Sequence, residues 1–176
     1  LSLLLPLGLS YYTFSSVGYI LDVYWRKAEF EPDAVLLFTC MIYFPHIVEG
    51  PIGQYDKLMP QFRKLPGFRR KEVCFGLQLM LWGFFKKLVI ADRIAIITGT
   101  IFGDVYSYPG WYLFLGMILN VIQLYTDFSG CMDIVTGISE VYGIQLERNF
   151  NHPFEAVSIA DFWRRWHITL CRWFRS

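Results

Sequence analysis

The hydrophobic positions along the chain form four long stretches, at residues 3–21, 34–48, 73–102 and 111–132, with polar and charged loops between them. A helix needs about 20 predominantly apolar residues to cross a bilayer, and the first and last stretches are about that long. The second stretch is shorter, and charged residues interrupt the third. This pattern predicts an all-α fold of polytopic membrane helices together with interfacial amphipathic helices.

Residues 34–53 contain helix-breaking residues that a plain spanning helix lacks. Pro45 lies inside the apolar stretch, and a Gly-Pro-Ile-Gly sequence follows it. Irregular backbone at membrane depth is tolerated only where protein or a water-filled cavity satisfies its polar groups. One interpretation is a broken or re-entrant segment with His46 and Glu49 facing a cavity. The other places both residues at the membrane interface, where they cap the end of the segment.

The charges within residues 73–102 are Lys86, Lys87, Asp92 and Arg93. A charged side chain in the middle of a spanning helix costs about 3 kcal/mol, so a simple lipid-facing helix is disfavoured. Either a short interfacial helix ends near Lys87 and a second segment crosses the membrane, or the charges pair inward.

Residues 111–132 form the clearest span, yet polar residues recur along it at three- and four-residue steps. These are Asn120, Gln123, Asp127 and Ser129, and Asp133 follows the span. On a helix this spacing gives one polar face, which in a bilayer turns toward the interior of a bundle. We therefore expect Asp127 to be either functional or paired.

The pattern of residues 158–176 predicts a single amphipathic helix. Its apolar face carries Ile159, Phe162, Trp163, Trp166, Leu170, Trp173 and Phe174. Its opposite face carries Asp161, Arg164, Arg165, Arg172 and Arg175. Tryptophans at headgroup depth and arginines facing anionic phosphates are typical of helices at a membrane surface. His167 falls on the border of the two faces, beside Cys171, where a ligand or substrate group could reach it; the alternative is a surface anchor without chemistry.

The composition favours the bilayer as solvent, because 55% of the residues are hydrophobic and 19% are aromatic. Basic residues cluster at 57–72 and 164–175, and the positive-inside rule places the loop at 54–72 on the cytoplasmic side. These basic stretches flank apolar spans, so membrane lipid is the expected partner and nucleic acid is not. The four cysteines are widely spaced, with no histidine at metal-ligand spacing, so we expect unpaired thiols and no metal site.

Several motifs stand out along the chain. In the first half they are Tyr12-Thr13-Phe14, Asp22-Val23-Tyr24, Phe44-Pro45 and Glu49-Gly50-Pro51-Ile52. In the second half they are Tyr125-Thr126-Asp127-Phe128-Ser129-Gly130 with Asp133, Asn149-Phe150-Asn151 with Pro153-Phe154, and Asp161-Phe162-Trp163-Arg164-Arg165-Trp166-His167-Ile168-Thr169-Leu170. In this order, and over nearly the whole chain, they resemble the membrane-bound O-acyltransferase (MBOAT) family.

This resemblance implies transfer of an acyl group, usually acetyl, across the membrane toward hydroxyls of an extracytoplasmic polysaccharide such as alginate. It further implies a multi-pass protein of the bacterial inner membrane and a periplasmic or extracellular partner protein. The acyl donor would be acetyl-CoA or an acyl carrier protein. Two alternatives stay open: D-alanyl transfer to teichoic acid, and a non-catalytic transporter or scaffold whose polar stripe lines a conduit.

The resemblance also implies that residues 1–176 are one incomplete domain of a larger bundle, truncated at both ends. His167 matches the first of two important histidines of the family. The second, in a Trp-His-Gly context, is usually assigned as catalytic and is expected beyond Ser176, so we expect the chain alone to be inactive.

Acyl transfer to an alcohol needs a base, and histidine is suited because its pKa lies near neutrality. We therefore predict that His167 acts as a base or in handling the acyl donor, with Asp127 or Asp161 as an orienting group. On a continuous helix Asp161 and His167 would project about 120° apart and should not touch. The remaining candidates for the site are Arg164, Arg165, His46 and Glu49.

Overall fold

The computed structural model describes residues 8–45, 50, 55–64 and 67–175, which form helices joined by loops, with no strand among them. The α-helices are α1 (Leu9–Tyr24), α2 (Ala34–Met41), α4 (Tyr55–Arg63), α5 (Arg70–Phe84), α6 (Asp92–Gly103), α7 (Gly110–Val141), α8 (Ile159–Arg165) and α9 (Ile168–Trp173). A π-helical segment, η1 (Phe85–Ala91), and two 3₁₀ turns, η2 (Val105–Ser107) and η3 (Pro153–Glu155), complete the order. The all-α prediction is confirmed.

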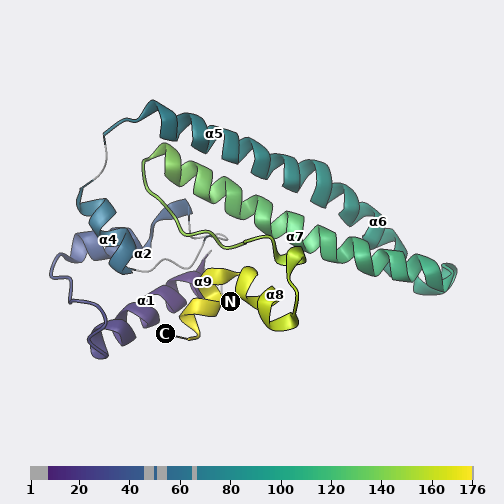
Figure 1. Cartoon of the computed structure of the whole chain (residues 1–176), viewed down its shortest axis with the longest axis horizontal. Helices are drawn as coiled ribbons and strands as arrows, with labels where there is room; N and C mark the ends of the chain where they lie inside the picture. The colour runs from purple at the N-terminus through teal and green to yellow at the C-terminus, as the bar shows by residue number, and fades with distance from the viewer. Residues whose placement is uncertain (1–7, 46–49, 51–54, 65–66, 176) are drawn as a thin grey trace, which may run out of the picture.

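Two long helical rods dominate the molecule. The elements α5, η1 and α6 run on as one rod over Arg70–Gly103, and α7 returns antiparallel along it (Figure 1). By length and composition both rods could cross a membrane. At 1.5 Å per residue, 34 residues extend about 50 Å, which exceeds the roughly 30 Å of a hydrocarbon core. The alternative in which a short helix ends near Lys87 is therefore wrong, because the rod continues through that point.

Glycines bring the two rods into backbone contact. Gly76 faces Gly137 and Gly83 faces Gly130, each pair seven residues from the other along both helices. A methyl group at Gly83 would lie 2.6 Å from the carbonyl oxygen of Gly130, closer than any real contact. Such small residues let helix backbones approach and fix the register of one helix on the other.

That register brings the mid-rod charges together. Lys86 Nζ lies 2.6 Å from Asp133 Oδ2, and Lys87 Nζ lies 2.6 Å from Asp127 Oδ1 and 3.2 Å from Asp92 Oδ1. Both lysines belong to η1, whose wider i→i+5 turn lets two consecutive residues reach α7. The inward-pairing alternative is thus confirmed for three of the four charges, and Asp127 is paired.

The N-terminal helices pack on one another beside the rods. Tyr19 of α1, Cys40 of α2 and Tyr55 of α4 form a buried cluster. The side chain of Asp33 caps α2 by accepting from the backbone N–H groups of Val35 and Leu36 at 2.9 and 3.1 Å. Helix α2 ends at Met41, before the predicted helix breaker Pro45.

Two expectations for this half of the chain meet the structure only in part. For the predicted span at residues 3–21, the described part forms α1 over Leu9–Tyr24, which at 16 residues is not among the two helices long enough to cross a membrane. Residues 54–72 are not one continuous helix, as predicted, but Pro60 lies inside α4 and the helix ends only at Arg63. His46 and Glu49 lie outside the described residues, so their placement stays a prediction.

The single helix predicted for residues 158–176 is wrong. The chain forms two short helices, α8 and α9, separated at Trp166 and His167. His167 adopts a left-handed backbone conformation with φ 45° and ψ 56°. The two predicted faces therefore do not run along one helix, and the 120° separation of Asp161 from His167 does not apply.

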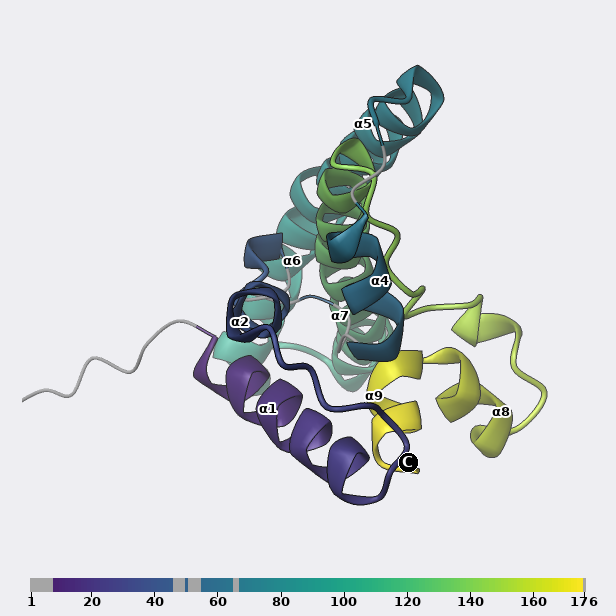
Figure 2. The same cartoon turned by 90° about the vertical axis from the view of Figure 1, so that its left-hand side faces the viewer.

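The second short helix is fixed against the first helix of the chain, where the two views of the molecule also place it (Figures 1 and 2). The ring of Trp173 lies 5.0 Å from that of Phe14, edge to face. The indole also covers Gly18, where a methyl group would lie 2.7 Å from its Nε1. Consequently α9 has a defined position although it is only six residues long.

Candidate active site

The break between α8 and α9 carries the histidine that the sequence singled out. The imidazole of His167 is half-buried and lies edge-on to the ring of Phe128 in α7, with ring centroids 5.0 Å apart. Its Nδ1 is buried and has no hydrogen-bond partner among the residues that the structure describes. Burial lowers the pKa of His167 below its ordinary value. Burial therefore favours the neutral imidazole, which is the form that accepts a proton.

The backbone of His167 is strained, because left-handed conformations cost a residue other than glycine about 1–2 kcal/mol. Two other described residues of this kind, Arg26 and His152, are exposed at helix ends. Only at His167 does the turn carry a half-buried ring against a neighbouring helix. Strained backbone of this kind clusters at functional sites, held by the structure around it.

Hydrogen bonds from residues 149–151 hold the break on both sides. Asn149 receives bonds from both residues that follow His167, Ile168 and Thr169, at 2.6–3.1 Å. On the other side the backbone N–H of Asn151 donates to the carbonyl of Arg165 at 2.9 Å. Since no glycine or proline stands in residues 158–176, these bonds from a distant segment account for the break.

An aromatic cluster fills the space between α7, η3 and α8. Its members are Tyr125, Phe150, Phe154, Phe162 and Trp166, with ring centroids of neighbouring members 5.0–6.5 Å apart. Phe150 also meets Phe128 at 5.2 Å, which joins the cluster to the ring that His167 contacts. Edge-to-face aromatic packing of this kind adds about 0.5–1.5 kcal/mol per pair beyond burial. The cluster makes an aromatic wall beside the histidine.

Asp161 and the two predicted arginines lie in α8, and Asp161 pairs with Arg165 rather than with His167. Asp161 Oδ2 accepts from Arg165 Nε at 3.0 Å and from the backbone N–H of Val157 at 3.3 Å. The Arg165 hydrogen bond holds the pKa of Asp161 below its usual range. Arg164 is exposed. The structure thus joins Asp161 to Arg165 and shows no hydrogen bond from either to His167.

Asp127 stands next to the site without entering it. Its carboxylate is engaged by Lys87, while the following residue, Phe128, supplies the ring contact to His167. The structure therefore brings the two sequence candidates to the same part of α7 but does not pair them.

A second electrostatic feature ties the site to the N-terminal half. Glu147 accepts hydrogen bonds from both Lys57 of α4 and Arg172 of α9. Burial alone would raise the pKa of Glu147, but the hydrogen bonds from the two cations outweigh it and lower the pKa. Neither partner is near Glu147 in sequence, so the pattern of residues gave no sign of this link.

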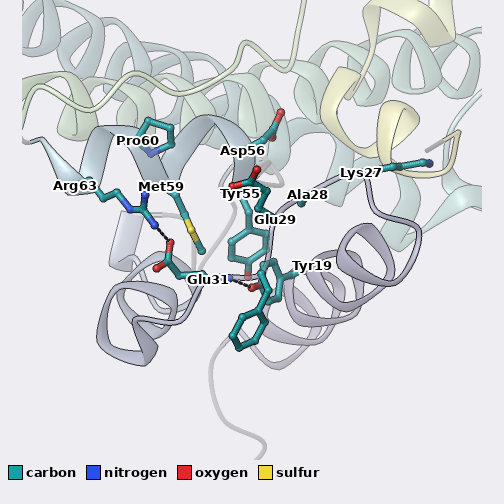
Figure 3. Close-up of a pocket in the computed structure, with 11 residues that line it drawn as sticks. Tyr19, Lys27, Ala28, Glu29, Glu31, Tyr55, Asp56, Met59, Pro60 and Arg63 are labelled. Carbon is teal, nitrogen blue, oxygen red and sulfur yellow. Dashed lines mark hydrogen bonds and ion pairs between the residues drawn. The ribbon is translucent and has the colours of Figure 1, made fainter.

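A cavity of about 460 Å³ lies between the α1–α2 loop and α4 (Figure 3). Within it, buried Glu31 pairs with Arg63 and its backbone N–H donates to the hydroxyl of Tyr19 at 2.9 Å. His167 does not line this cavity. The cavity is lined by charged groups of both signs, and its buried acid, Glu31, is already paired with Arg63. Among the described residues no group of three or more His, Cys, Asp or Glu could hold a metal ion, and none of the four cysteines forms a disulfide.

Sequence reasoning missed two residues that build the site. Phe128 stands in a quoted motif, but only the fold reveals that it meets His167. Asn149 stands in the Asn-Phe-Asn motif as a polar residue without an obvious helix to cap, and the fold buries it almost fully between more exposed neighbours.

Comparison with known proteins agrees with this architecture. The model of the MBOAT, or membrane-bound O-acyltransferase, family matches residues 26–176. The chain therefore belongs to the membrane-bound O-acyltransferase family. Membership of a membrane-bound family also accounts for the two long apolar rods.

Three relatives cover nearly all of the chain. A probable alginate O-acetylase of Azotobacter vinelandii is 37% identical over 176 residues, which are 99% of this chain and 34% of that protein. A peptidoglycan O-acetyltransferase of Helicobacter pylori is 32% identical over 202 residues, covering all of this chain and 38% of that protein. A teichoic acid D-alanyltransferase of Bacillus subtilis is 29% identical over 183 residues, covering 97% of this chain and 44% of that protein. The chain spans about a third of the length of the alginate O-acetylases it matches.

Proposed function

We propose that the protein is an O-acyltransferase that transfers an acyl group, acetyl in the first instance, across the membrane toward hydroxyls of an extracytoplasmic polysaccharide such as alginate. The observation that carries the proposal is the placement of His167, a half-buried imidazole in a strained turn within the family's long motif. Family membership supports the reaction class. Identities of 35–37% to probable alginate O-acetylases support acetyl as the group transferred.

In the proposed reaction the imidazole of His167 takes the proton of the acceptor hydroxyl as the hydroxyl oxygen attacks the acyl carbonyl carbon. A new ester C–O bond forms and the bond between the acyl carbon and the donor's leaving group breaks. With a thioester donor, such as acetyl-CoA or an acyl carrier protein, the leaving group is a thiolate, which receives the proton back from the imidazolium. A base of this kind typically contributes about 10²–10⁴-fold to the rate.

The other site candidates have supporting roles in this proposal. Asp127 acts through Lys87 to fix the part of α7 that carries Phe128, and the Asp161–Arg165 pair fixes α8. Arg164, His46 and Glu49 are proposed as cavity residues that meet the donor or acceptor.

D-alanyl transfer to teichoic acid is the second candidate. It is supported by 29% identity to a teichoic acid D-alanyltransferase over 97% of the chain. The higher identity to alginate O-acetylases favours acetyl transfer.

A conduit along the polar stripe of α7 has less support. Ser129, Asp127 and Asp133 are engaged by the two lysines of η1, and Gln123 accepts from the hydroxyl of Thr98 at 2.8 Å. Polar groups that are satisfied by one another offer little to a passing solute.

We further propose that the protein lies in the bacterial inner membrane as a multi-pass protein and delivers acyl groups to a periplasmic or extracellular partner that completes transfer to the polymer. The experiment is a deletion strain complemented with the wild-type gene, with O-acetyl and D-alanyl esters quantified on its extracellular polymers. Restored O-acetyl esters would support the proposal. Restored D-alanyl esters would favour the second candidate, and restoration of neither would contradict both.

A further inference from the structure

Asn149 is a buried polar residue that no step of the proposed reaction uses. Its side chain is 3% exposed, although it lies in the loop that follows α7. A buried amide is expensive unless both its donor and its acceptor are satisfied, so its partners reveal what holds it there.

Within the described part of the chain, Asn149 accepts its hydrogen bonds from the two residues after His167. Its backbone carbonyl accepts from the N–H of Ile168 at 2.9 Å. Its Oδ1 accepts from the backbone N–H of Thr169 at 3.1 Å and from the Thr169 hydroxyl at 2.6 Å. These bonds fix the chain where the left-handed turn at His167 enters α9.

The donor side of the same amide reaches α7. Asn149 Nδ2 donates to Met132 Sδ at 3.1 Å. Met132 stands four residues after Phe128, so the two residues share one face of α7. Phe128 is the residue whose ring His167 contacts. One side chain therefore links the turn at His167 to the helix face that the imidazole meets.

We propose that Asn149 is a positioning residue of the active site, which holds the turn at His167 so that the imidazole is presented to the face of α7 that carries Phe128. This inference rests on the proposed role of His167 in acyl transfer. Asn149 itself touches no reacting atom and acts through the backbone of Ile168 and Thr169.

The test uses the complete gene product in native membranes and two readouts. The first is the rate at which diethyl pyrocarbonate modifies His167, followed by mass spectrometry, which reports access to the imidazole without requiring activity. The second is acyl transfer, with kcat and KM for the donor measured separately. We expect Asn149→Leu to make His167 react several times faster and to lower kcat about 10- to 100-fold, the cost of a misplaced catalytic group, with KM unchanged.

Three further variants separate positioning from folding. Thr169→Val removes the hydroxyl bond to Asn149 but keeps the backbone bond, and it should give a smaller shift in the same direction. Thr169→Ser keeps the hydroxyl and should behave as wild type. Asn151→Leu is the matched control, because the side chain of Asn151 is exposed and its bond to Arg165 is made by the backbone. If Asn149→Leu does not accumulate in the membrane, the reactivity of His167 in Thr169→Val is compared with that in Thr169→Ser. Faster modification in Thr169→Val alone would support the inference, and equal rates would overturn it.

Unchanged reactivity of His167 in Asn149→Leu and Thr169→Val would overturn the inference. Equal losses in Asn149→Leu and Asn151→Leu would also overturn it. The proposed function fails separately: if His167→Ala kept full acyl transfer, His167 would have no catalytic role, while the reactivity measurements would still decide whether Asn149 positions its side chain.

Discussion

The imidazole of His167 meets the ring of Phe128 edge to face, with centroids 5.0 Å apart, although 39 positions of sequence separate them. The contact sets a half-buried base against an apolar ring of α7, next to the carboxylate that Lys87 neutralises. Because the imidazole is desolvated there, its uncharged form is favoured. The site is thus built from a turn that the helix pattern did not predict and a helix that it did.

The lowered pKa of His167 predicts a specific pH dependence. A base is active when deprotonated, and an ordinary histidine gains its proton below a pH of about 6.5. Since burial lowers this pKa, wild-type acyl transfer should hold its rate to more acidic pH, with the midpoint of its acidic limb below 6.5. Phe128→Ala admits water beside the ring and should raise that midpoint.

The measurement is the pH profile of kcat/KM for acyl transfer in membranes, with Phe114→Ala as control, since Phe114 is an exposed residue of the same helix. A wild-type midpoint at or above 6.5, or an equal shift in the control, would count against a buried base.

The glycine contacts between the rods predict a sharp difference between two similar substitutions. Gly83→Ala places a methyl group 2.6 Å from the carbonyl oxygen of Gly130, so the rods must separate, at about 1–3 kcal/mol. Gly99→Ala, in α6 of the same rod, meets nothing within 4 Å and should not lower stability. Thermal unfolding in detergent measures both, and equal midpoints would show that the rods do not meet at Gly83.

The pair of Lys86 with Asp133 predicts non-additive losses. Either Lys86→Met or Asp133→Leu leaves a partner charge unpaired between the rods, at roughly 3 kcal/mol. The double variant removes both charges and should be more stable than the sum of the two losses predicts. Lys71→Met, at an exposed position in α5, is the control. Strict additivity in thermal unfolding would contradict a direct pair.

The link from Glu147 to Lys57 and Arg172 predicts a loss of stability in acid. A carboxyl whose folded-state pKa is lowered contributes stability above the unfolded-state value of about 4.3, and that stability is lost as the pH falls through the folded-state pKa. The unfolding midpoint of wild type should therefore exceed that of Glu147→Gln at pH 6, and the difference should shrink below about pH 4. A difference that stays constant down to pH 3 would contradict the link.

The long rods and their inward charges could be predicted from sequence because hydrophobicity and charge are local properties. Residues 73–102 and 111–132 are apolar over the length of a span, and a lysine pair inside such a stretch needs partners. What the sequence left open was which carboxylates are those partners. That choice depends on the register set by Gly83 on Gly130, a contact between residues 47 apart.

The break at His167 could not be predicted because nothing local demands it. Residues 158–176 have a helical period of apolar side chains and lack glycine and proline, so the pattern favours one helix. Asn149 and Asn151 overrule that preference with hydrogen bonds from a segment some twenty residues earlier. The functional interpretation of His167 came from the motif. The burial of its imidazole against Phe128 and its left-handed backbone are visible only in the fold.

The most direct test of the account compares two histidines that share a left-handed backbone, His167 and His152. A deletion strain is complemented with His167→Ala or His152→Ala, the two proteins are brought to equal levels in the membrane, and O-acyl esters on the extracellular polymer are quantified. His152 is exposed, with its imidazole near Glu155 alone among the described residues, so its replacement should leave acylation unchanged. We predict that His167→Ala lowers acylation at least about 100-fold, as loss of a general base does. Wild-type acylation by His167→Ala, with the protein present in the membrane, would contradict the central claim.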